Sequence, residues 1–392
     1  MSTSLIMLIA LYHKYTKATW HLLLVVWLWL VSSSSGFGQL QWTRVTSCER
    51  CGDYYDVTHG NGQWLIVGSA GKILTSPDGL TWTEQSAPTK EDLLSVVYGA
   101  GQWVAVGTNG TILTSSNGIS WTLRQTDPAN RLNSVSHGAG LWLAVGKTNS
   151  VRVQYGIYYT SPDGINWTYQ PQAGSLSYSL NHVNYLNGTW FLLGGGGMFT
   201  SPNGLDWTRR DVQTVNYLTS IAYGAGNYLI STVEGYIAKS PDGINWTRSS
   251  SVSQQTADLS YGAAQWVAVG GLLTGRPPIA VSPDGINWRE NESPADNNLH
   301  GVYFTGNRGI AVGRDYTILT TTSFVCASKQ SGDWIDPTTW SCGREPISTD
   351  VITLNPGHTI NITSNTAQAQ QIVNNGGKLL FTSTSARLFF TK

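Results

Sequence analysis

The feature that most restricts the fold of this chain is an internal repeat of about 40 residues. One copy runs from Val96 to Trp121 and contains Tyr98-Gly-Ala-Gly-Gln-Trp103 and Ser115-Ser-Asn-Gly-Ile-Ser-Trp121. Successive copies end in a tryptophan with spacings of 39, 46, 40, 39 and 42 residues: Trp82, Trp121, Trp167, Trp207, Trp246 and Trp288. A period near 40 residues is typical of β-propeller blades. The repeat therefore predicts an all-β protein.

Each copy divides into four short strands, A to D, with tight-turn residues between them. Strand A ends before a Gly-Ala-Gly turn, and strand B is of the Gln-Trp-Val-Ala-Val-Gly type. Strand C is of the Thr-Ile-Leu-Thr-Ser type, and strand D carries the terminal tryptophan. Pro-Asp-Gly between C and D predicts a turn, because proline fixes φ, aspartate bonds the local backbone and glycine accepts positive φ.

A seventh copy is incomplete, and the missing strand lies at the other end of the repeat region. Strands A to C are present up to Thr322, without a Pro-Asp-Gly turn or its tryptophan. Trp42, in Gln41-Trp-Thr-Arg-Val45, lies 40 residues before Trp82 and so is on period. We therefore predict a seven-bladed β-propeller over residues 39–325, in which an N-terminal strand closes the last blade and removes a sheet edge. The seven tryptophans at this position, from Trp42 to Trp288, are expected to pack between blades.

Composition and the N-terminal segment restrict the class of protein. The net charge is zero, with 23 basic and 23 acidic residues, which argues against a nucleic-acid partner. Residues 1–38 combine Lys14 and Lys17 with the apolar run 22–31 and small residues after it, which predicts a signal peptide. An N-terminal anchor is the alternative, and an uncleaved leader would be the one contact with a membrane. We expect a secreted or cell-surface protein.

The four cysteines suit an oxidising compartment. A single Cys-x-x-Cys is weak support for a zinc site. We expect local disulfides instead, Cys48–Cys51 and Cys326–Cys342, with free thiols as the alternative.

Once these turns are aligned, the repeat resembles the Asp-box, or BNR, repeat of sialidase-like propellers. Ser76-Pro-Asp-Gly-Leu-Thr-Trp82 recurs with variations in six copies, with Gly directly after Asp, so that the turn is one residue shorter than in that family. The resemblance implies structural turns on the face away from an active site, at Asp78, Asn117, Asp163, Asn203, Asp242 and Asp284. Each turn supplies one carboxylate at most, whereas Ca²⁺ takes six or more oxygens, so we predict neither a metal nor a cofactor.

Candidate binding residues lie in the irregular B–C and D–A loops, since long loops on a rigid scaffold are where binding residues concentrate. They are Arg152, Glu234, Arg276, Arg314 and Asp315. The Arg-Ile-Pro motif that the resemblance implies for a sialidase is missing, and Arg276-Pro-Pro278 lies in the sixth blade. The sequence therefore indicates no catalytic residue. His59 and His137 replace aromatic residues at a repeat position and are expected to serve packing.

Residues 326–392 leave the repeat and resemble a β-rich, often β-helical module of secreted bacterial surface proteins, on Trp334-Ile-Asp-Pro-Thr-Thr-Trp340. They are either such a module, truncated, or a small cap. For the whole chain we expect a monomeric, non-catalytic exported propeller that binds a glycan, a protein or a surface partner through its loops. A sialidase-like glycoside hydrolase is the alternative. A second is an assembly factor resembling the propellers that help to build photosystem II.

Overall fold

A computed structural model shows how far this expectation holds. It describes residue 40 and residues 42–390, apart from 47–51, 126, 151–154, 171–177, 213–216, 250, 264, 273–274, 306–307, 322–324, 341–344, 347–349, 364–366, 370 and 383–385. The predicted leader, Cys48, Cys51, Cys342 and Arg152 lie outside these residues. The described chain forms two compact units, one over Leu40–Ser323 and one that includes Phe324–Lys392.

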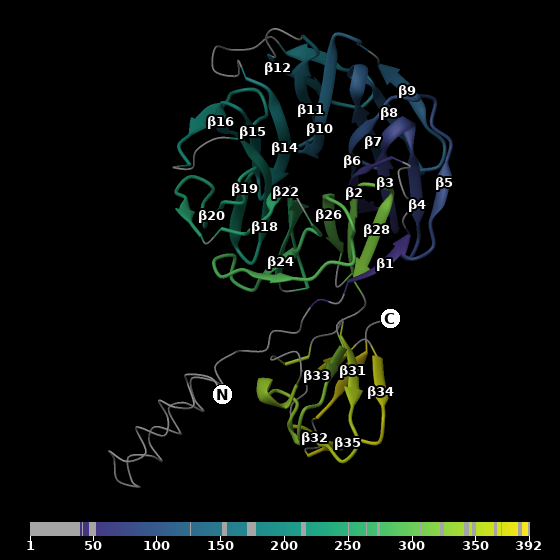
Figure 1. Cartoon of the computed structure of the whole chain (residues 1–392), viewed down its shortest axis with the longest axis vertical. Helices are drawn as coiled ribbons and strands as arrows, with labels where there is room; N and C mark the ends of the chain where they lie inside the picture. Colours follow the sequence, from purple (N-terminus) through teal and green to yellow (C-terminus); the bar gives the residue numbers. More distant parts are fainter. Residues whose placement is uncertain are drawn as a thin grey trace. The chain divides into compact units, whose positions relative to one another are not determined.

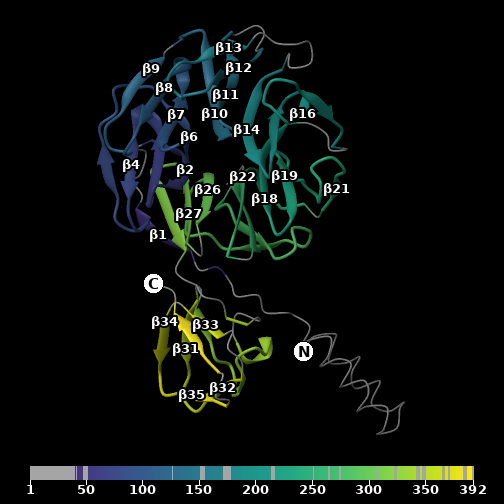
Figure 2. The same ribbon diagram turned by 180° about the vertical axis from the view of Figure 1, so that it is seen from behind.

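The first unit is a seven-bladed β-propeller, as the repeat predicts, and its blades are four-stranded antiparallel sheets (Figures 1 and 2). The innermost strands of blades 1 to 7 are β2 (Tyr54–Gly60), β6 (Leu93–Gly99), β10 (Asn130–Gly138), β14 (Leu180–Leu186), β18 (Leu218–Gly224), β22 (Gln255–Gly262) and β26 (Leu299–Thr305). The second strands are β3 (Gln63–Gly68), β7 (Gln102–Gly107), β11 (Leu141–Thr148), β15 (Thr189–Gly194), β19 (Asn227–Thr232), β23 (Gln265–Gly271) and β27 (Arg308–Gly313).

The outer half of each blade is shorter. The third strands are β4 (Ile73–Ser76), β8 (Ile112–Ser115), β12 (Gly156–Ser161), β16 (Gly197–Ser201), β20 (Ile237–Ser240), β24 (Ile279–Ser282) and β28 (Thr317–Thr321). The outermost strands are β5 (Thr83–Gln85), β9 (Thr122–Gln125), β13 (Thr168–Gln170), β17 (Thr208–Arg210), β21 (Thr247–Arg248), β25 (Arg289–Asn291) and, in blade 7, β1 (Trp42–Thr46). Two 3-10 turns, η1 (Ser69–Gly71) and η2 (Thr108–Gly110), follow the second strands of blades 1 and 2. No α-helix occurs in the described residues.

Strand β1 closes the ring. It pairs antiparallel with β28, with Trp42 opposite Thr321 and Thr43 opposite Thr320. Blade 7 therefore takes three strands from one end of the propeller sequence and one from the other, in the order β1-β28-β27-β26. Innermost strands of neighbouring blades contact one another around the whole ring, including β26 and β2 at the closure.

The hydrophobic core lies between blades as well as within them. One buried cluster joins Val104, Val106 and Ile112 of blade 2 to Leu132 and Trp142 of blade 3. Trp167 packs against that cluster, and Trp82, Trp121, Trp207, Trp246 and Trp288 take the equivalent places between other pairs of blades. In blades 1 to 6 the outermost strand begins one residue after its tryptophan. Burial of these large rings supplies much of the apolar contact between blades.

The second unit is a stack of short parallel strands. Three parallel sheets are formed by β29 (Val325–Ala327), β31 (Val351–Leu354) and β34 (Gln371–Asn374); by β30 (Gly332–Asp333), β32 (Thr359–Ile362) and β35 (Lys378–Phe381); and by β33 (Ala367–Ala369) and β36 (Leu388–Phe390). One 3-10 turn, η3 (Pro337–Thr339), precedes Trp340. Successive rungs pass through these sheets in turn, which is the arrangement of a β-helix. Trp334 and Trp340 are buried and pack edge to face, with ring centroids 5.1 Å apart.

Cys326 lies in β29 and is buried in the core of the second unit. Because the other three cysteines lie outside the described residues, both predicted disulfides stay predictions. In the part of the chain that the structure describes, no helix has the length and hydropathy needed to span a membrane.

Candidate functional site

The two faces of the propeller differ in how regular they are. We call the face that carries the turns between third and outermost strands the turn face. At Asp284, Oδ1 accepts hydrogen bonds from the backbone N–H groups of Ile286 and Asn287, each at 2.8 Å. Asp78, Asp163 and Asp242 make the same pair of contacts, and Asn117 and Asn203 make them through the amide oxygen. All six side chains thus act as local turn caps.

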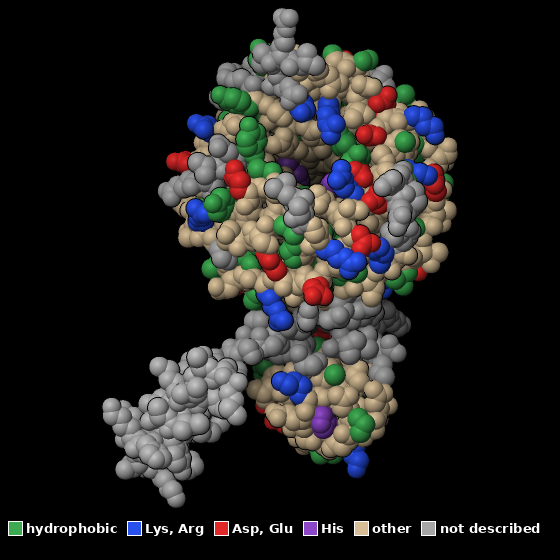
Figure 3. Space-filling model, viewed as in Figure 1, with side chains coloured by type: hydrophobic (Ala, Val, Ile, Leu, Met, Phe, Trp, Pro, Cys, Tyr) green, Lys and Arg blue, Asp and Glu red, His purple; other side chains and the backbone are tan. Residues whose placement is uncertain are grey.

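The opposite face, which we call the loop face, is irregular and carries many charged side chains around the mouth of a central hollow (Figure 3). It comprises the connections between second and third strands and those from each blade to the next. Arg314 and Asp315 lie there, in the turn between β27 and β28, beside Asp53 of the neighbouring blade. Arg314 Nε lies 3.9 Å from Asp53 Oδ2, and its side chain is 56% exposed. The Asp315 backbone N–H donates to Asp53 Oδ1 over 3.4 Å.

His300 belongs to the same cluster. Its Nε2 lies 3.7 Å from Asp53 Oδ2, and its ring lies 5.6 Å from that of Tyr55. Burial lowers the pKa of His300, and the nearby Asp53 carboxylate only partly offsets this. The imidazole is therefore neutral at pH 7, and the contact is not an ion pair. Blades 7 and 1 thus meet at a group of one exposed guanidinium, two carboxylates, an imidazole and a phenol.

The other predicted binding residues on the loop face are Arg276 and Glu234. Arg276 pairs with Asp296 at 2.8 Å, and Asp296 also pairs with Arg44 of β1 at 2.7 Å. These three residues join blades 6 and 7 and so have a structural contact of their own. Glu234 is exposed in the turn between β19 and β20. Asn297, which follows Asp296, donates a hydrogen bond to Asp315, so the Arg276–Asp296 pair borders the segment that carries Arg314 and Asp315. Glu234 lies apart from this segment in sequence, in blade 5.

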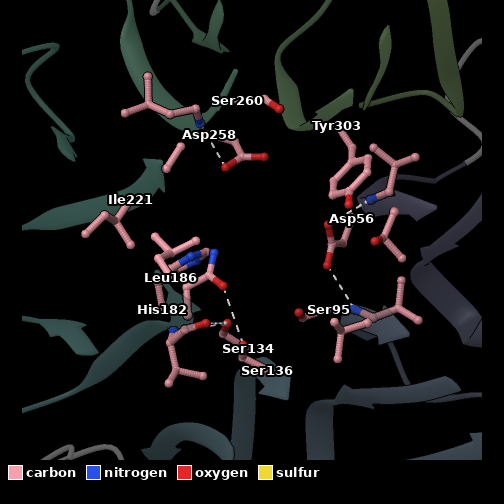
Figure 4. Close-up of a pocket in the computed structure, with 18 of the residues that line it drawn as sticks. Asp56, Ser95, Ser134, Ser136, His182, Leu186, Ile221, Asp258, Ser260 and Tyr303 are labelled. Atoms are coloured by element: carbon pink, nitrogen blue, oxygen red, sulfur yellow. Dashed lines mark hydrogen bonds between the residues drawn. The ribbon is translucent and has the colours of Figure 1, made fainter. Parts of the chain in front are cut away.

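A channel of about 430 Å³ runs along the innermost strands, and all seven blades contribute to its wall. Asp56 and Asp258 lie on either side of Tyr303, and His182 lies across the channel from them (Figure 4). Hydroxyl groups of Thr58, Ser136 and Ser260 add to the polar lining, and Leu186 adds an apolar one. None of these residues stands out by itself in the sequence, because each belongs to a strand of the repeat.

Seven residues occupy one equivalent position on the innermost strands, and we call this set the belt: Asp56, Ser95, Ser134, His182, Ser220, Asp258 and Gly301. Each innermost strand has a register shift at or next to its belt residue, so that the belt side chain turns toward the next blade. In five places it accepts the backbone N–H of the following innermost strand. Asp56 accepts from Val96 at 2.8 Å and Asp258 from Val302 at 2.9 Å. The serines accept from Val135, Val183 and Leu259 at 3.2–3.4 Å.

Two belt positions lack such a bond among the described residues. Gly301 has no side chain, and a Cβ there would lie 3.2 Å from the Tyr55 carbonyl oxygen, because blade 1 approaches closely where the ring closes. The N–H that a side chain at position 301 would accept is that of Val57 in blade 1. Asp56 accepts it instead, through its Oδ1 at 2.8 Å. The other is His182, whose Nε2 is buried and has no hydrogen-bond partner.

The two belt carboxyl groups are held in an unfavourable place for a charge. Burial raises the pKa of Asp56 to about 7, which the Val96 N–H opposes and the charge of Asp258 reinforces. Burial likewise raises the pKa of Asp258 to about 6, against the hydrogen bonds from Val302, Ser220 and Leu259. Protein surrounds both groups, yet both keep some exposed surface because they border the channel. Burial also lowers the pKa of His182 to about 4, so this imidazole is neutral at pH 7.

His59 and His137 line the channel three residues after the belt position of their strands, where other blades have tyrosine or phenylalanine. Their rings lie 5.1 Å from Trp64 and 4.4 Å from Trp142, as Tyr98 lies 4.8 Å from Trp103. Burial lowers the pKa of both histidines. They are neutral packing residues in this position. Across the described residues no group of three or more His, Cys, Asp and Glu side chains has the spacing of a metal site.

The fold and the channel together define the class of protein: a β-propeller of seven blades with a polar central channel. Solved structures with this fold include YCF48 from Cyanidioschyzon merolae, 19% identical over 71% of this chain and 98% of that one, with a TM-score of 0.56. They also include YCF48 bound to D1 peptide, 19% identical over 72% of this chain and 97% of that one, with a TM-score of 0.57.

A third similar structure is a catalytically inactive variant of virginiamycin B lyase from Staphylococcus aureus with quinupristin. It is 12% identical over 72% of this chain and 99% of that one, with a TM-score of 0.61. No protein-family model matches the sequence, and neither does any curated protein. A peptide-bound propeller and a lyase thus share this scaffold, so the fold by itself does not decide between binding and catalysis.

Proposed function

We propose that this chain is a non-catalytic binding propeller that takes a segment of a protein partner at its loop face. The observation that carries the proposal is the difference between the two faces. The turn face repeats one capped turn six times, whereas the loop face gathers Asp53, His300, Arg314 and Asp315 at the junction of blades 7 and 1. Charged and aromatic side chains presented by loops on a rigid scaffold are the usual means of recognising a partner.

The solved complex of YCF48 with a peptide supports a polypeptide as the ligand, because it shows that a propeller of this shape can hold one. Further parts of the proposal rest on the sequence. Export rests on residues 1–38, and membership of the Asp-box family rests on the six turns from Ser76 to Trp288. A glycan or another surface ligand at the same face is the competing possibility, and the experiment below separates them.

The experiment selects ligands from a random linear peptide library displayed on phage, against immobilised protein of residues 39–392. Binding of a selected, labelled peptide is then measured by fluorescence anisotropy for the wild type, Arg314→Ala and Arg289→Ala. Arg289 is the matched control because it is exposed on the outermost strand β25, away from the junction. We expect Arg314→Ala to weaken binding about tenfold, since arginine is enriched among binding hot spots, and Arg289→Ala to have no effect.

Equal loss in both variants, or in neither, would contradict the placement of the site. A glycan array run with the same three proteins tests the other ligand class, because glycan binding lost in Arg314→Ala alone would replace the protein partner by a carbohydrate. Turnover of a fluorogenic sialoside by the folded wild-type protein would overturn the non-catalytic assignment.

A further inference from the structure

The central channel has two carboxyl groups at positions whose structural role a hydroxyl group can fill. The belt needs an acceptor for one backbone N–H per blade, and the hydroxyl of Ser95, Ser134 or Ser220 supplies it in three blades. Asp258 does the same task for Val302 with a carboxylate. Burial of a carboxylate costs far more than burial of a hydroxyl unless a cation or further donors compensate it. Asp258 has neutral donors, the Ser220 hydroxyl and the backbone N–H groups of Leu259 and Val302, but no cation among the described residues that contact it. The channel wall that the structure describes contains no Lys or Arg.

A second, independent feature lies in the wall of the same channel. His182 Nε2 is buried without a hydrogen-bond partner, on the wall across from the two carboxylates (Figure 4). Because the imidazole is neutral at pH 7, one of its two ring nitrogens is an acceptor. A buried polar atom without a partner is costly, and such atoms are normally satisfied by a ligand, by water or by protein. Tyr303 and Ser260 place two hydroxyl groups beside the carboxylates.

We propose that the central channel is a binding site for a small organic amine, which it holds by its alkylammonium group. Asp56 and Asp258 supply the negative charge, and His182, Ser260 and Tyr303 supply further polar atoms around it. This site lies inside the ring and is separate from the junction of blades 7 and 1 at which we place the protein partner. The two proposals can therefore fail separately.

The chemistry of the wall selects an ammonium group over other cations. A metal ion is disfavoured because the described residues contain no group of three or more metal-ligating side chains. A guanidinium is planar and pairs best with both oxygens of one carboxylate. Here the oxygens of each carboxylate already accept backbone N–H groups, and the two carboxylates stand on different blades. An ammonium is a compact charge that needs only one accessible lone pair of a carboxylate oxygen, so it suits carboxylates that already accept backbone N–H groups. Leu186 and Val97 provide apolar surface for a short alkyl chain.

The test titrates the protein with n-butylammonium chloride by isothermal calorimetry at pH 8, with n-butanol as the uncharged control. A parallel titration with the peptide acetyl-Gly-Gly-Lys-Gly-Gly-amide asks whether a lysine side chain can enter instead. We expect saturable binding of n-butylammonium and none of n-butanol. Binding of the peptide as well would assign the ammonium to a protein partner rather than to a free amine. Absence of saturable n-butylammonium and peptide binding to folded protein would overturn the proposal.

One variant and a matched control test where the amine binds. Asp258→Ser puts the residue of blades 2, 3 and 5 into the belt of blade 6, and we expect it to weaken binding at least about tenfold. Asp242→Asn is the control, because it also removes a carboxylate but at a turn where blades 2 and 4 already carry asparagine. Equal binding by the wild type and Asp258→Ser would contradict the site.

Ser260→Lys places a tethered ammonium in the channel beside Asp258. It should abolish n-butylammonium binding and raise the melting temperature, whereas a lysine in a channel that is not a cation site should lower it. This outcome separates the proposal from simple misfolding.

The pH dependence gives a further check. Binding should weaken as the pH falls from 8 to 5, because the carboxyl groups of Asp56 and Asp258 take up protons in that range. The other titratable groups of the wall are His59, Tyr98, His137, His182, Tyr185, Tyr223, Tyr261 and Tyr303. The three histidines among them have lowered pKa values, so they contribute no charge at the upper end of this range. Binding that strengthens toward pH 5 would count against the carboxylates as the acceptors.

Discussion

At the scale of single residues, the turns of the propeller test how much one side chain contributes to a blade. Asp284 Oδ1 accepts two backbone N–H groups and the Ser282 hydroxyl. Burial alone would raise the pKa of Asp284, but the hydrogen bonds from Asn287 and Ile286 outweigh it and bring the pKa to about 2. The carboxylate is therefore the form that stabilises the turn.

We predict that Asp284→Ala lowers the free energy of unfolding by about 1 kcal/mol, the usual cost of losing a side-chain cap. Asp284→Asn should cost less, because Asn117 and Asn203 cap the same turn in blades 2 and 4 through their amide oxygens. Urea unfolding followed by tryptophan fluorescence measures both changes. An Asn variant as unstable as the Ala variant would show that charge, rather than geometry, makes this turn.

The stability that the belt carboxyl groups contribute depends on pH in the opposite direction to that of the turn carboxylates. The pKa of Asp258 is about 6 in the folded protein, above the value near 4 of an unfolded chain. A raised pKa means that Asp258 contributes stability fully below about pH 4, and that this contribution is lost as the pH rises through 6. The turn carboxylates change in the other direction, because their stabilisation is lost as the pH falls.

We therefore predict that Asp258→Ser gains stability relative to the wild type between pH 4 and pH 7, by up to about 2 kcal/mol. The measurement is the difference in unfolding free energy between the two proteins in urea at pH 4.5, 6 and 7.5. Asp242→Asn serves as the control, since its difference from the wild type should not rise over this range. A flat difference for Asp258→Ser would mean that the buried carboxyl keeps an ordinary pKa.

At the scale of elements, the innermost strands pack so closely that the glycine at their C-terminal end has no room for a side chain. A Cβ on Gly138 at the end of β10 would lie 2.0 Å from the ring of Tyr185 on the next blade, and Gly60, Gly99, Gly224 and Gly262 face the next aromatic ring in the same way. This contact explains why the repeat keeps an aromatic residue next to a glycine.

Replacing this glycine is the corresponding test. Gly138→Ala should destabilise the protein by about 2 kcal/mol, within the usual cost of overpacking a close-packed contact. Gly195→Ala, where a Cβ would meet the nearest atom at an ordinary 3.5 Å, is the matched substitution in the turn after β15. Thermal unfolding of the two variants should separate them by several degrees. Similar melting temperatures would show that Tyr185 can move without cost.

The same scale shows what the sequence can and cannot predict. The sequence repeats with a period of about 40 residues, which Trp42 and the six later tryptophans mark. This period made it possible to predict the number of blades, their four strands and the place of β1. The belt was not predicted, because its bonds join a side chain of one blade to a backbone N–H of the next. An aligned repeat does carry a trace of it, since one strand position reads Asp, Ser, Ser, His, Ser, Asp, Gly. The pairing of Arg276 with Asp296 likewise depends on loops whose course no period describes.

At the scale of the whole propeller, closure depends on one strand that is not continuous in sequence with its blade. In blade 4 the outermost strand β17 follows β16 through a tight turn, and Thr208 lies opposite Thr200. In blade 7 the equivalent Thr43 of β1 lies opposite Thr320, 277 residues away. We therefore expect a local defect in β17 to leave the ring intact, and the same defect in β1 to open it between blades 7 and 1.

We predict that Thr43→Pro with Arg44→Pro destabilises the entire ring, whereas Thr208→Pro with Arg209→Pro acts only on blade 4. Proline removes ladder hydrogen bonds in both cases. Arg44 also pairs with Asp296, so Arg44→Ala measures the loss of that ion pair by itself, and this loss is subtracted before the two proline pairs are compared. Hydrogen exchange measured by mass spectrometry should show lost protection in β28, β26 and β2 for the first pair, and in β16 and β17 alone for the second. The midpoint of urea unfolding should fall further for the first pair, because opening the ring also frees the contact between β26 and β2. If exchange in the first pair stayed confined to β1 and β28, the six complete blades would hold the ring without the closing strand.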